Sequence, residues 1–143
     1  MKVVLDTSVL VAAFAARGLC GAVVAACLAW HEIVLSEHIL GELRRNLRGK
    51  IKLPAAHADA ILVFLREHAA IVTPDRVEAG ACRDPTDLAV LGTAVAAAAD
   101  VLVTGDRDLL ELRIFRGTAI LSPRAFHGRI RRLPLRRGPS PEP

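Results

Sequence analysis

The sequence predicts a three-layer α/β/α fold with a mostly parallel central sheet. Short apolar strands alternate with helical segments along the chain, and this alternation favours parallel strands joined by helical crossovers. The first strand, at 2–5, lacks polar alternation, as expected where helices cover both faces of a sheet. Acidic residues follow the first and the last clear strand, at the edge where open α/β sheets build their sites.

Two helices and a strand follow that first strand. Segments 8–16 and 21–29 have helical character, with Thr7 or Ser8 as the first cap and a break near Gly18. Residues 31–35 form the next predicted strand. The second helix directs four small side chains toward the core: Cys20, Val23, Val24 and Cys27.

The middle of the chain contains two further helices. Ser36 caps a helix that runs to about Arg48, and Glu42 lies at the edge of its apolar stripe, where a side chain reaches a cleft. A second helix begins at Pro54, ends near His68 and leads to a strand at 70–73. The stripe of the first helix consists of Ile39, Leu40, Leu43 and Leu47.

Residues 84–87 contain the clearest helix start in the chain. Asp84 is placed at the N-cap, Pro85 at the first helical position and Asp87 at the third. The helix that follows is apolar almost all round, so we expect it to be buried. A strand at 100–104, a helical turn within 106–112, a strand at 118–121 and a helix from 123 to about 131 complete the predicted order.

Length and composition indicate one domain of 143 residues with 52% hydrophobic and 3% aromatic residues. We expect residues 1–131 to form it and 132–143 to be a disordered basic tail rich in Pro and Arg, either solubilising or in contact with RNA. Beyond Gly128 lie five of the 19 basic residues and one of the 15 acidic ones. The rest carries 14 of each, so acids gathered in one site would leave positive surface around it, as suits a polyanion.

No apolar run approaches a membrane span, and the N-terminus enters a strand at once. We therefore expect a cytoplasmic protein without membrane contact. Its three cysteines match no zinc pattern and are expected to be structural.

Four acids, Asp6, Glu42, Asp87 and Asp106, are the candidate site. Carboxylates that meet at one sheet edge are costly to hold together without a cation, and oxygen ligands suit Mg²⁺ or Mn²⁺. Each acid also has a structural alternative: Asp6 and Asp106 as helix caps, Asp87 as a partner of backbone N–H groups in its own first turn, and Glu42 as a solvated helix residue.

Several motifs in order resemble PIN-domain proteins, and among them the ribonuclease toxins of VapBC-type toxin–antitoxin systems. The resemblance covers about residues 1–125. The motifs are Val-Val-Leu-Asp6-Thr-Ser-Val-Leu, Ser36-x5-Glu42-Leu, Arg83-Asp84-Pro85-Thr86-Asp87-x3-Leu91 and Ala99-Asp100-x3-Thr104-Gly105-Asp106-Arg107-Asp108-Leu109-Leu110. Relatives often carry a further acid where this chain has Thr86, which bears on a second metal position.

The resemblance implies a Mg²⁺- or Mn²⁺-dependent endoribonuclease whose catalytic and metal-binding quartet is Asp6, Glu42, Asp87 and Asp106. Hydrolysis assisted by one or two ions predicts 5′-phosphate and 3′-hydroxyl ends. It also implies a homodimer and a cognate antitoxin. The auxiliary candidates are Thr7, Ser8, Asp84, Thr104 and Asp108, and the candidates for substrate phosphates are Arg44, Arg45, Arg48 and Arg107. Val9, Leu10, Phe14 and Leu19 offer apolar surface for a partner unless the core buries them.

Two other functions remain open. A haloacid-dehalogenase-type phosphatase would use Asp6 as its nucleophile, but that family wants a second Asp where this chain has Ser8. It also wants a downstream Lys, and the only later lysines are Lys50 and Lys52. A non-catalytic RNA-binding or regulatory module would keep the fold and bind metal structurally. DNA stays possible as the substrate, because no residue visibly reads a 2′-hydroxyl.

Overall fold

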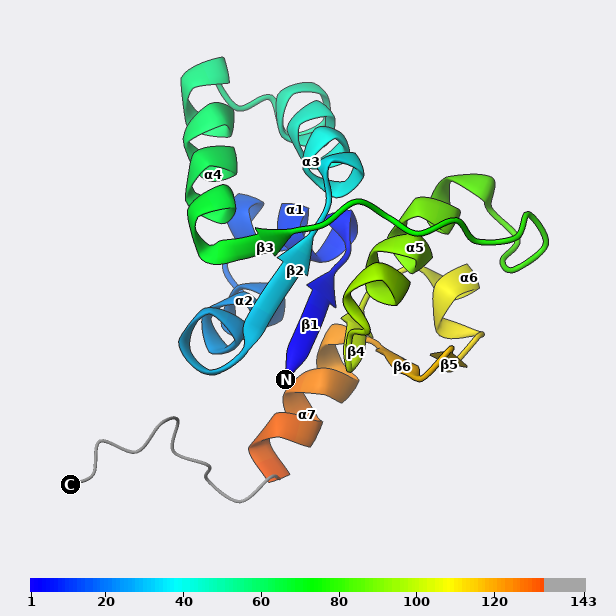
Figure 1. Ribbon diagram of the computed structural model, residues 1–143. Coiled ribbons are helices and arrows are strands. Elements are labelled where there is room, and N and C mark those ends of the chain that lie inside the picture. The colour runs from blue at the N-terminus through cyan, green and yellow to red at the C-terminus, as the bar shows by residue number, and fades with distance from the viewer. Residues whose placement is uncertain (133–143) are drawn as a thin grey trace.

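The computed structural model describes residues 1–132. They form a sheet of order β3-β2-β1-β4-β6-β5 flanked by helices (Figure 1). All neighbouring strands are parallel except β5 and β6. This arrangement confirms the predicted α/β/α fold with a mostly parallel sheet. The strands are β1 (Lys2–Leu5), β2 (Glu32–Leu35), β3 (Ala69–Ile71), β4 (Val101–Val103), β5 (Ile114–Phe115) and β6 (Thr118–Leu121).

Helices cover both faces of the sheet. In Figure 1, α5 lies in front of the central strands and α1 lies behind them; α1 packs against α2 and α3, and α2 packs against α7. The α-helices are α1 (Thr7–Ala15), α2 (Leu19–Trp30), α3 (Glu37–Gly49), α4 (Ala55–His68), α5 (Leu88–Ala97), α6 (Arg107–Leu110) and α7 (Pro123–Arg132), and a 3₁₀ turn, η1 (Pro85–Asp87), precedes α5.

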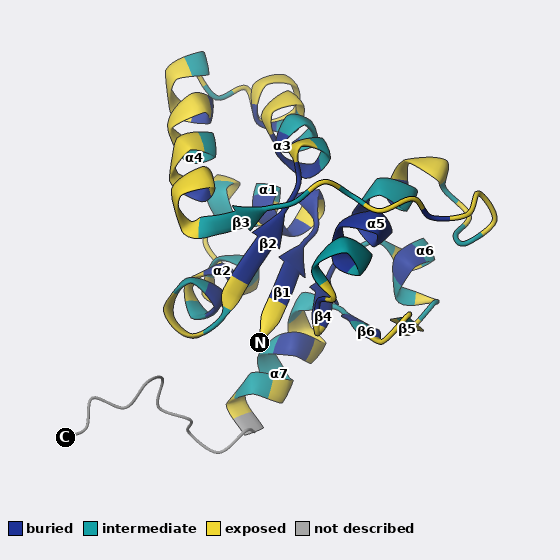
Figure 2. Cartoon of the chain, in the orientation of Figure 1, coloured by how far each residue is buried: buried dark blue, intermediate teal, exposed yellow. Residues whose placement is uncertain are grey.

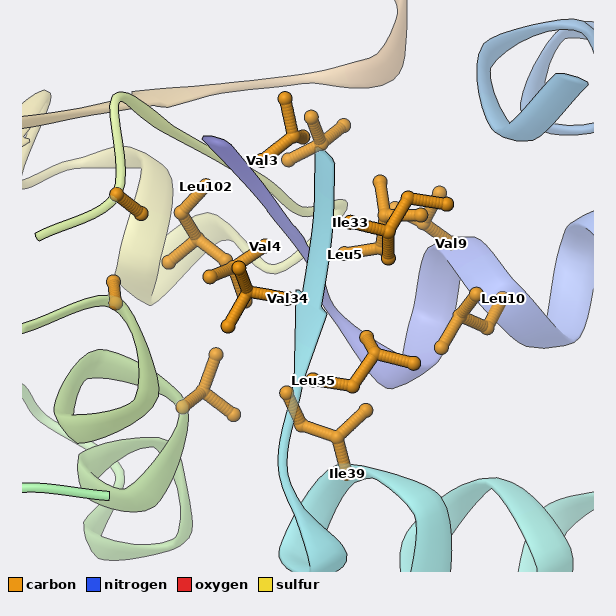
Figure 3. Close-up of a cluster of buried hydrophobic side chains, with 14 of the residues drawn as sticks. Val3, Val4, Leu5, Val9, Leu10, Ile33, Val34, Leu35, Ile39 and Leu102 are labelled. Atoms are coloured by element: carbon orange, nitrogen blue, oxygen red, sulfur yellow. The ribbon is translucent and has the colours of Figure 1, made fainter. Parts of the chain in front are cut away.

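The core lies on both faces of β1, as the apolar sequence of that strand predicts. Figure 3 shows Leu5 and Ile33 on the same side of the sheet as Val9 of α1, while Val4 and Val34 lie on the other side with Leu102. All of these side chains are buried. Figure 2 shows buried residues concentrated in the central strands and α5, whereas much of α4 is exposed.

Two local predictions differ from the structure. Asp6, not Thr7 or Ser8, caps α1, because its Oδ1 accepts a hydrogen bond from the Thr7 N–H at 2.7 Å. Strand β5 is absent from the sequence prediction. Its two residues are too few to show alternation, and it is joined to β6 by Arg116 and Gly117, both with positive φ, as in tight hairpins.

The predicted apolar partner surface is largely core. Val9 and Leu10 are buried, Phe14 is half-buried against Phe64, and Leu19 is exposed. Within residues 1–132 no single helix has the length and apolarity to cross a membrane; α1 and α2 reach that length only as a pair bent by 105°. The predicted tail, 132–143, lies outside the described residues except for Arg132, which closes α7.

A long segment between β3 and η1 is held against α5. The Asp75 N–H donates to the Gly92 carbonyl at 3.0 Å. A Cβ at position 92 would lie 2.3 Å from the Asp75 carbonyl oxygen, so only glycine permits this close approach. The contact anchors the segment that leads to Asp84 and Asp87.

Candidate active site

Asp6 and Asp106 follow the adjacent parallel strands β1 and β4 at their carboxyl ends. Asp6 is 6% exposed and directly precedes α1, and Asp106 is half-buried and directly precedes α6. Each carboxylate caps its helix: Asp6 Oδ1 accepts from Thr7 N–H, and Asp106 Oδ1 accepts from the Asp108 N–H at 2.8 Å. The alternative role as helix caps is therefore real for both residues, and it places both carboxylates at the same edge.

The buried Thr104 hydroxyl connects these two strand ends. Its Oγ1 donates to Asp6 Oδ2 at 2.6 Å and accepts from the Asp106 N–H at 3.0 Å. A hydroxyl has one proton to donate and lone pairs to accept, so both contacts form at once. The hydroxyl thereby fixes the position of the Asp6 carboxylate relative to the start of α6.

Glu42 reaches the same place from α3. Its Oε1 accepts from the Thr7 hydroxyl at 3.1 Å and lies 3.6 Å from Nε2 of His38, one turn earlier on the helix. Thr7 is the first residue of α1, directly after Asp6. The side chain at the edge of the α3 stripe therefore does reach the strand ends, as its spacing predicts.

Asp87 approaches from the turn before α5. Asp84 caps that turn, since its Oδ1 accepts from the backbone N–H and the hydroxyl of Thr86. Asp87 itself is 7% exposed, and its Oδ2 is buried without a hydrogen-bond partner among the described residues. A buried carboxylate oxygen without a hydrogen-bond partner is rare in folded proteins, and a functional role is one explanation for it.

Burial and mutual repulsion raise the pKa values of two of these acids. The pKa of Asp87 rises to about 7, first through desolvation and then through its interactions with Asp106, Asp6 and Asp84. Desolvation also raises the pKa of Asp6, against the hydrogen bonds from Thr104 and Thr7 that lower it. Glu42 and Asp106 raise it further. The site thus concentrates more negative charge than the protein alone stabilises.

The acids line one cleft of about 660 Å³ between α1, α3, η1 and the start of α6. As the side chains are oriented, no group of three Asp, Glu, His or Cys residues within 1–132 forms a ready metal-chelating set. The residues that line the cleft include Asp6, Thr7, Ser8, Glu42, Asp84, Thr86, Asp87 and Asp106.

The family model of the PIN domain matches residues 2–108, a span that includes all four acids and most of the chain. This chain belongs to the PIN-domain family. Members of the family are generally nucleases, and those nucleases generally use divalent metal ions. The matched residues end in α6, so β5, β6 and α7 lie beyond them.

The PIN fold is also found by structural comparison. The chain is similar to one chain of the crystal structure of VapBC2 from Rickettsia felis bound to a DNA fragment from their promoter. The TM-score is 0.60 at 16% sequence identity, over 85% of this chain and 98% of the other. Comparison with curated proteins gave no match. At this identity the likeness concerns the fold alone.

The remaining predicted residues occupy different parts of the PIN domain. Ser8 Oγ accepts from the Gly105 N–H at 3.3 Å, and Asp108 lies 3.8 Å from Nη1 of Arg83. Arg45 lines the cleft. Three other arginines are not among its lining residues: Arg44 pairs with Asp59 at 2.9 Å, Arg48 donates to the Leu53 carbonyl, and Arg107 is exposed.

Two polar cleft residues of the PIN domain, Asn46 and Lys50, are absent from the sequence prediction. They follow Glu42 by four and eight residues, which places all three on one side of α3. The sequence signal that could have identified them is their helical spacing from Glu42. Their residue types attract no attention singly, because an Asn and a Lys near a helix end are common on protein surfaces.

Proposed function

We propose that this PIN-domain protein is a divalent-metal-dependent endoribonuclease that leaves 5′-phosphate and 3′-hydroxyl ends. The observation that carries the proposal is the convergence of Asp6, Glu42, Asp87 and Asp106 from four separate segments onto one cleft. Nuclease activity is general in the family.

The donor set fits a Mg²⁺ or Mn²⁺ ion. Its ligand atoms are carboxylate oxygens, which these hard cations prefer. The Asp87 Oδ2 has no hydrogen-bond partner within residues 1–132 and supplies a free ligand. The pKa of Asp87 is raised first by desolvation and then by the neighbouring acids, and a bound cation offsets both effects. Asp6, Asp87 and Asp106 would hold the ion, and Glu42 would complete the set as a ligand through water or by orienting the attacking water.

The chain's other residues have supporting roles in this proposal. When bound, the ion would lower the pKa of a water molecule and stabilise negative charge on the phosphate. Thr104 and Thr7 hold Asp6 and Glu42 through the hydrogen bonds at 2.6 and 3.1 Å. Asp84 shapes the turn that presents Asp87, Ser8 binds the backbone beside Asp106, and Asp108 donates its N–H to Asp106.

The proposed biological role is the toxin of a toxin–antitoxin pair. The support is the motif order, the PIN domain and the fold shared with a chain of a VapBC2 structure. The corresponding partners are a cognate antitoxin and a second copy of the chain, in the cytoplasm. Sedimentation at micromolar concentration tests the dimer, and a monomer there contradicts it.

The decisive experiment is cleavage of end-labelled structured RNA by antitoxin-free protein, with Mn²⁺, with Mg²⁺ and with EDTA. Wild type is compared with Asp6→Asn, and a DNA of the same sequence runs in parallel. We expect metal-dependent cuts of RNA with 5′-phosphate ends that the variant does not make. Ends with 2′,3′-cyclic phosphate indicate attack by the ribose and contradict the mechanism. Metal binding without cleavage of any RNA favours the non-catalytic module.

A further inference from the structure

One side of α3 extends the cleft away from the acids. Glu42, Asn46 and Lys50 are spaced by four residues, about one helical turn each, and all three line the cleft. Arg45, three residues after Glu42, lines it too. We call Arg45, Asn46 and Lys50 the α3 ridge. It begins about one helical turn after Glu42 and ends at Lys50, the C-cap residue of α3.

The charge of the cleft changes along this direction. The acids that line it come from the segments around β1, η1 and α6, together with Glu42 of α3, which precedes the ridge. Its lining cations, Arg45 and Lys50, both belong to the ridge. A polyanion that places one phosphate at a cation held by the acids would set a neighbouring phosphate toward the ridge.

The apolar side chains that line the cleft are all aliphatic. Val11, Ala12 and Ala15 of α1 and Ile51 line it, and no aromatic residue does so among the described residues. These side chains have no hydrogen-bonding atoms for the edge of a base, and they offer no ring for stacking. A nucleotide lying here would therefore be held by its phosphate and not selected by its base.

We propose that the α3 ridge binds the RNA backbone next to the bond that is cleaved, without reading the base at that position. The inference rests on the proposed function and names residues for it. Arg45 and Lys50 contact phosphates as cations, and the Asn46 amide donates to a phosphate or ribose oxygen. Arg44 and Arg48, on the same helix, are engaged with Asp59 and the Leu53 carbonyl instead.

Binding of fluorescein-labelled single-stranded RNA across a salt series tests the ridge directly. The Asp6→Asn background prevents turnover, and Arg45→Ala, Lys50→Ala and Asn46→Ala are compared in it. Removing one phosphate contact on a single strand lowers the salt slope by about 0.7, which corresponds to about fourfold weaker binding near 0.15 M salt. The double variant Arg45→Ala/Lys50→Ala should lower the slope by about 1.4. Asn46→Ala should weaken binding without changing the slope.

Matched control variants distinguish phosphate contacts of the ridge from non-specific electrostatic attraction. Arg66→Ala removes the same charge from α4, where Arg66 pairs with Glu37, and should leave the slope of the series intact. Arg44→Ala and Arg48→Ala should lower it less than Arg45→Ala does. Equal losses from all arginines overturn the ridge in favour of diffuse attraction. Melting curves confirm that each variant folds.

The outcomes distinguish this inference from the proposed function. With Asp6 restored, the ridge variants should raise KM for RNA with little change in kcat. If wild type cleaves RNA and the ridge variants bind and cleave it equally well, the ridge inference fails and the nuclease stands. That result would assign this end of the cleft to another class of ligand, such as a protein segment. If slopes fall as expected but nothing is cleaved, the nuclease proposal fails, and only the binding of RNA phosphates by the ridge stands.

Discussion

Strand β4 has an aspartate beyond each end, and the two residues differ in every other respect. At the amino end, Asp100 is exposed; its Oδ2 accepts from the Lys2 N–H at 2.8 Å and its own N–H donates to the Lys2 carbonyl. At the carboxyl end, Asp106 is half-buried and lies among Asp6 and Asp87, whose pKa values it helps to raise. One end has a satisfied carboxylate, and the other has a surplus of negative charge.

The comparison shows that the role of an aspartate at a strand end depends on the residues around it. Asp100 completes the pairing of β1 with β4 and needs nothing more. Asp106 shares its edge with acids from β1, α3 and η1, because parallel strands bring their carboxyl ends together. Asp100 thus has a structural role, because it hydrogen-bonds to β1, whereas Asp106 is part of a candidate metal site.

The largest difference is expected in cleavage. Asp106→Asn should lower RNA cleavage by at least about a hundredfold, because it removes a charge that would hold the ion. Asp100→Asn, at the other end of the strand, should leave the rate within about twofold of wild type. Single-turnover cleavage with saturating protein measures both. Comparable losses in the two variants would mean that the two ends of β4 do not differ in function.

Metal binding should separate the same pair in stability. Mn²⁺ at 100 times its Kd should raise the free energy of unfolding of wild type by about 2.7 kcal/mol. Thermal melting with Mn²⁺ and with EDTA detects this without any substrate. Asp100→Asn should respond like wild type and Asp106→Asn should not. An equal response in Asp106→Asn would place the ion elsewhere.

The pH dependence of stability should come from the acidic end. Burial and the neighbouring acids raise the pKa of Asp87 to about 7 in the folded protein, from an ordinary value of 3.8. Between these two values the folded state therefore holds more protons than the unfolded state. In EDTA, the free energy of unfolding should therefore fall as the pH rises from about 4 to about 7. Asp87→Asn should reduce this fall, as should Mn²⁺. Urea titrations across that range test it, and an unchanged dependence in Asp87→Asn contradicts the assignment.

The smallest effects sharpen the comparison through two buried threonines. Thr104 donates to Asp6 at the acidic end, and Thr118 donates to the Ala99 carbonyl at 2.8 Å at the amino end. Each change to Val removes a buried hydrogen bond and should cost about 1–2 kcal/mol. Only Thr104→Val should also weaken Mn²⁺ binding, by about tenfold, because the Thr104 hydroxyl orients the proposed ligand Asp6. Equal metal affinity in both variants would make Thr104 merely structural.

The strands and helices that position the acids were predictable because their signals are local. Apolar runs, the Ser36 cap and the Asp84-Pro85 start each lie within a few residues, and all four acids sit on the predicted elements. The cap of α1 is predicted at Thr7 or Ser8, with Asp6 as the alternative, and the structure decides for Asp6. Strand β5 escaped prediction because its two residues pair only through the hairpin with β6.

The sequence by itself determined the succession of strands and helices along the chain apart from β5, the mostly parallel sheet and which acids follow its strands. Hydrophobic periodicity and capping, which act over a few residues, are the reason. Only the tertiary structure decided how these acids meet. Thr104 binds Asp6 across 98 positions in the sequence, Glu42 binds Thr7 across 35, and a buried oxygen of Asp87 has no hydrogen-bond partner within residues 1–132. Burial and charge repulsion depend on distances in space, which packing alone sets.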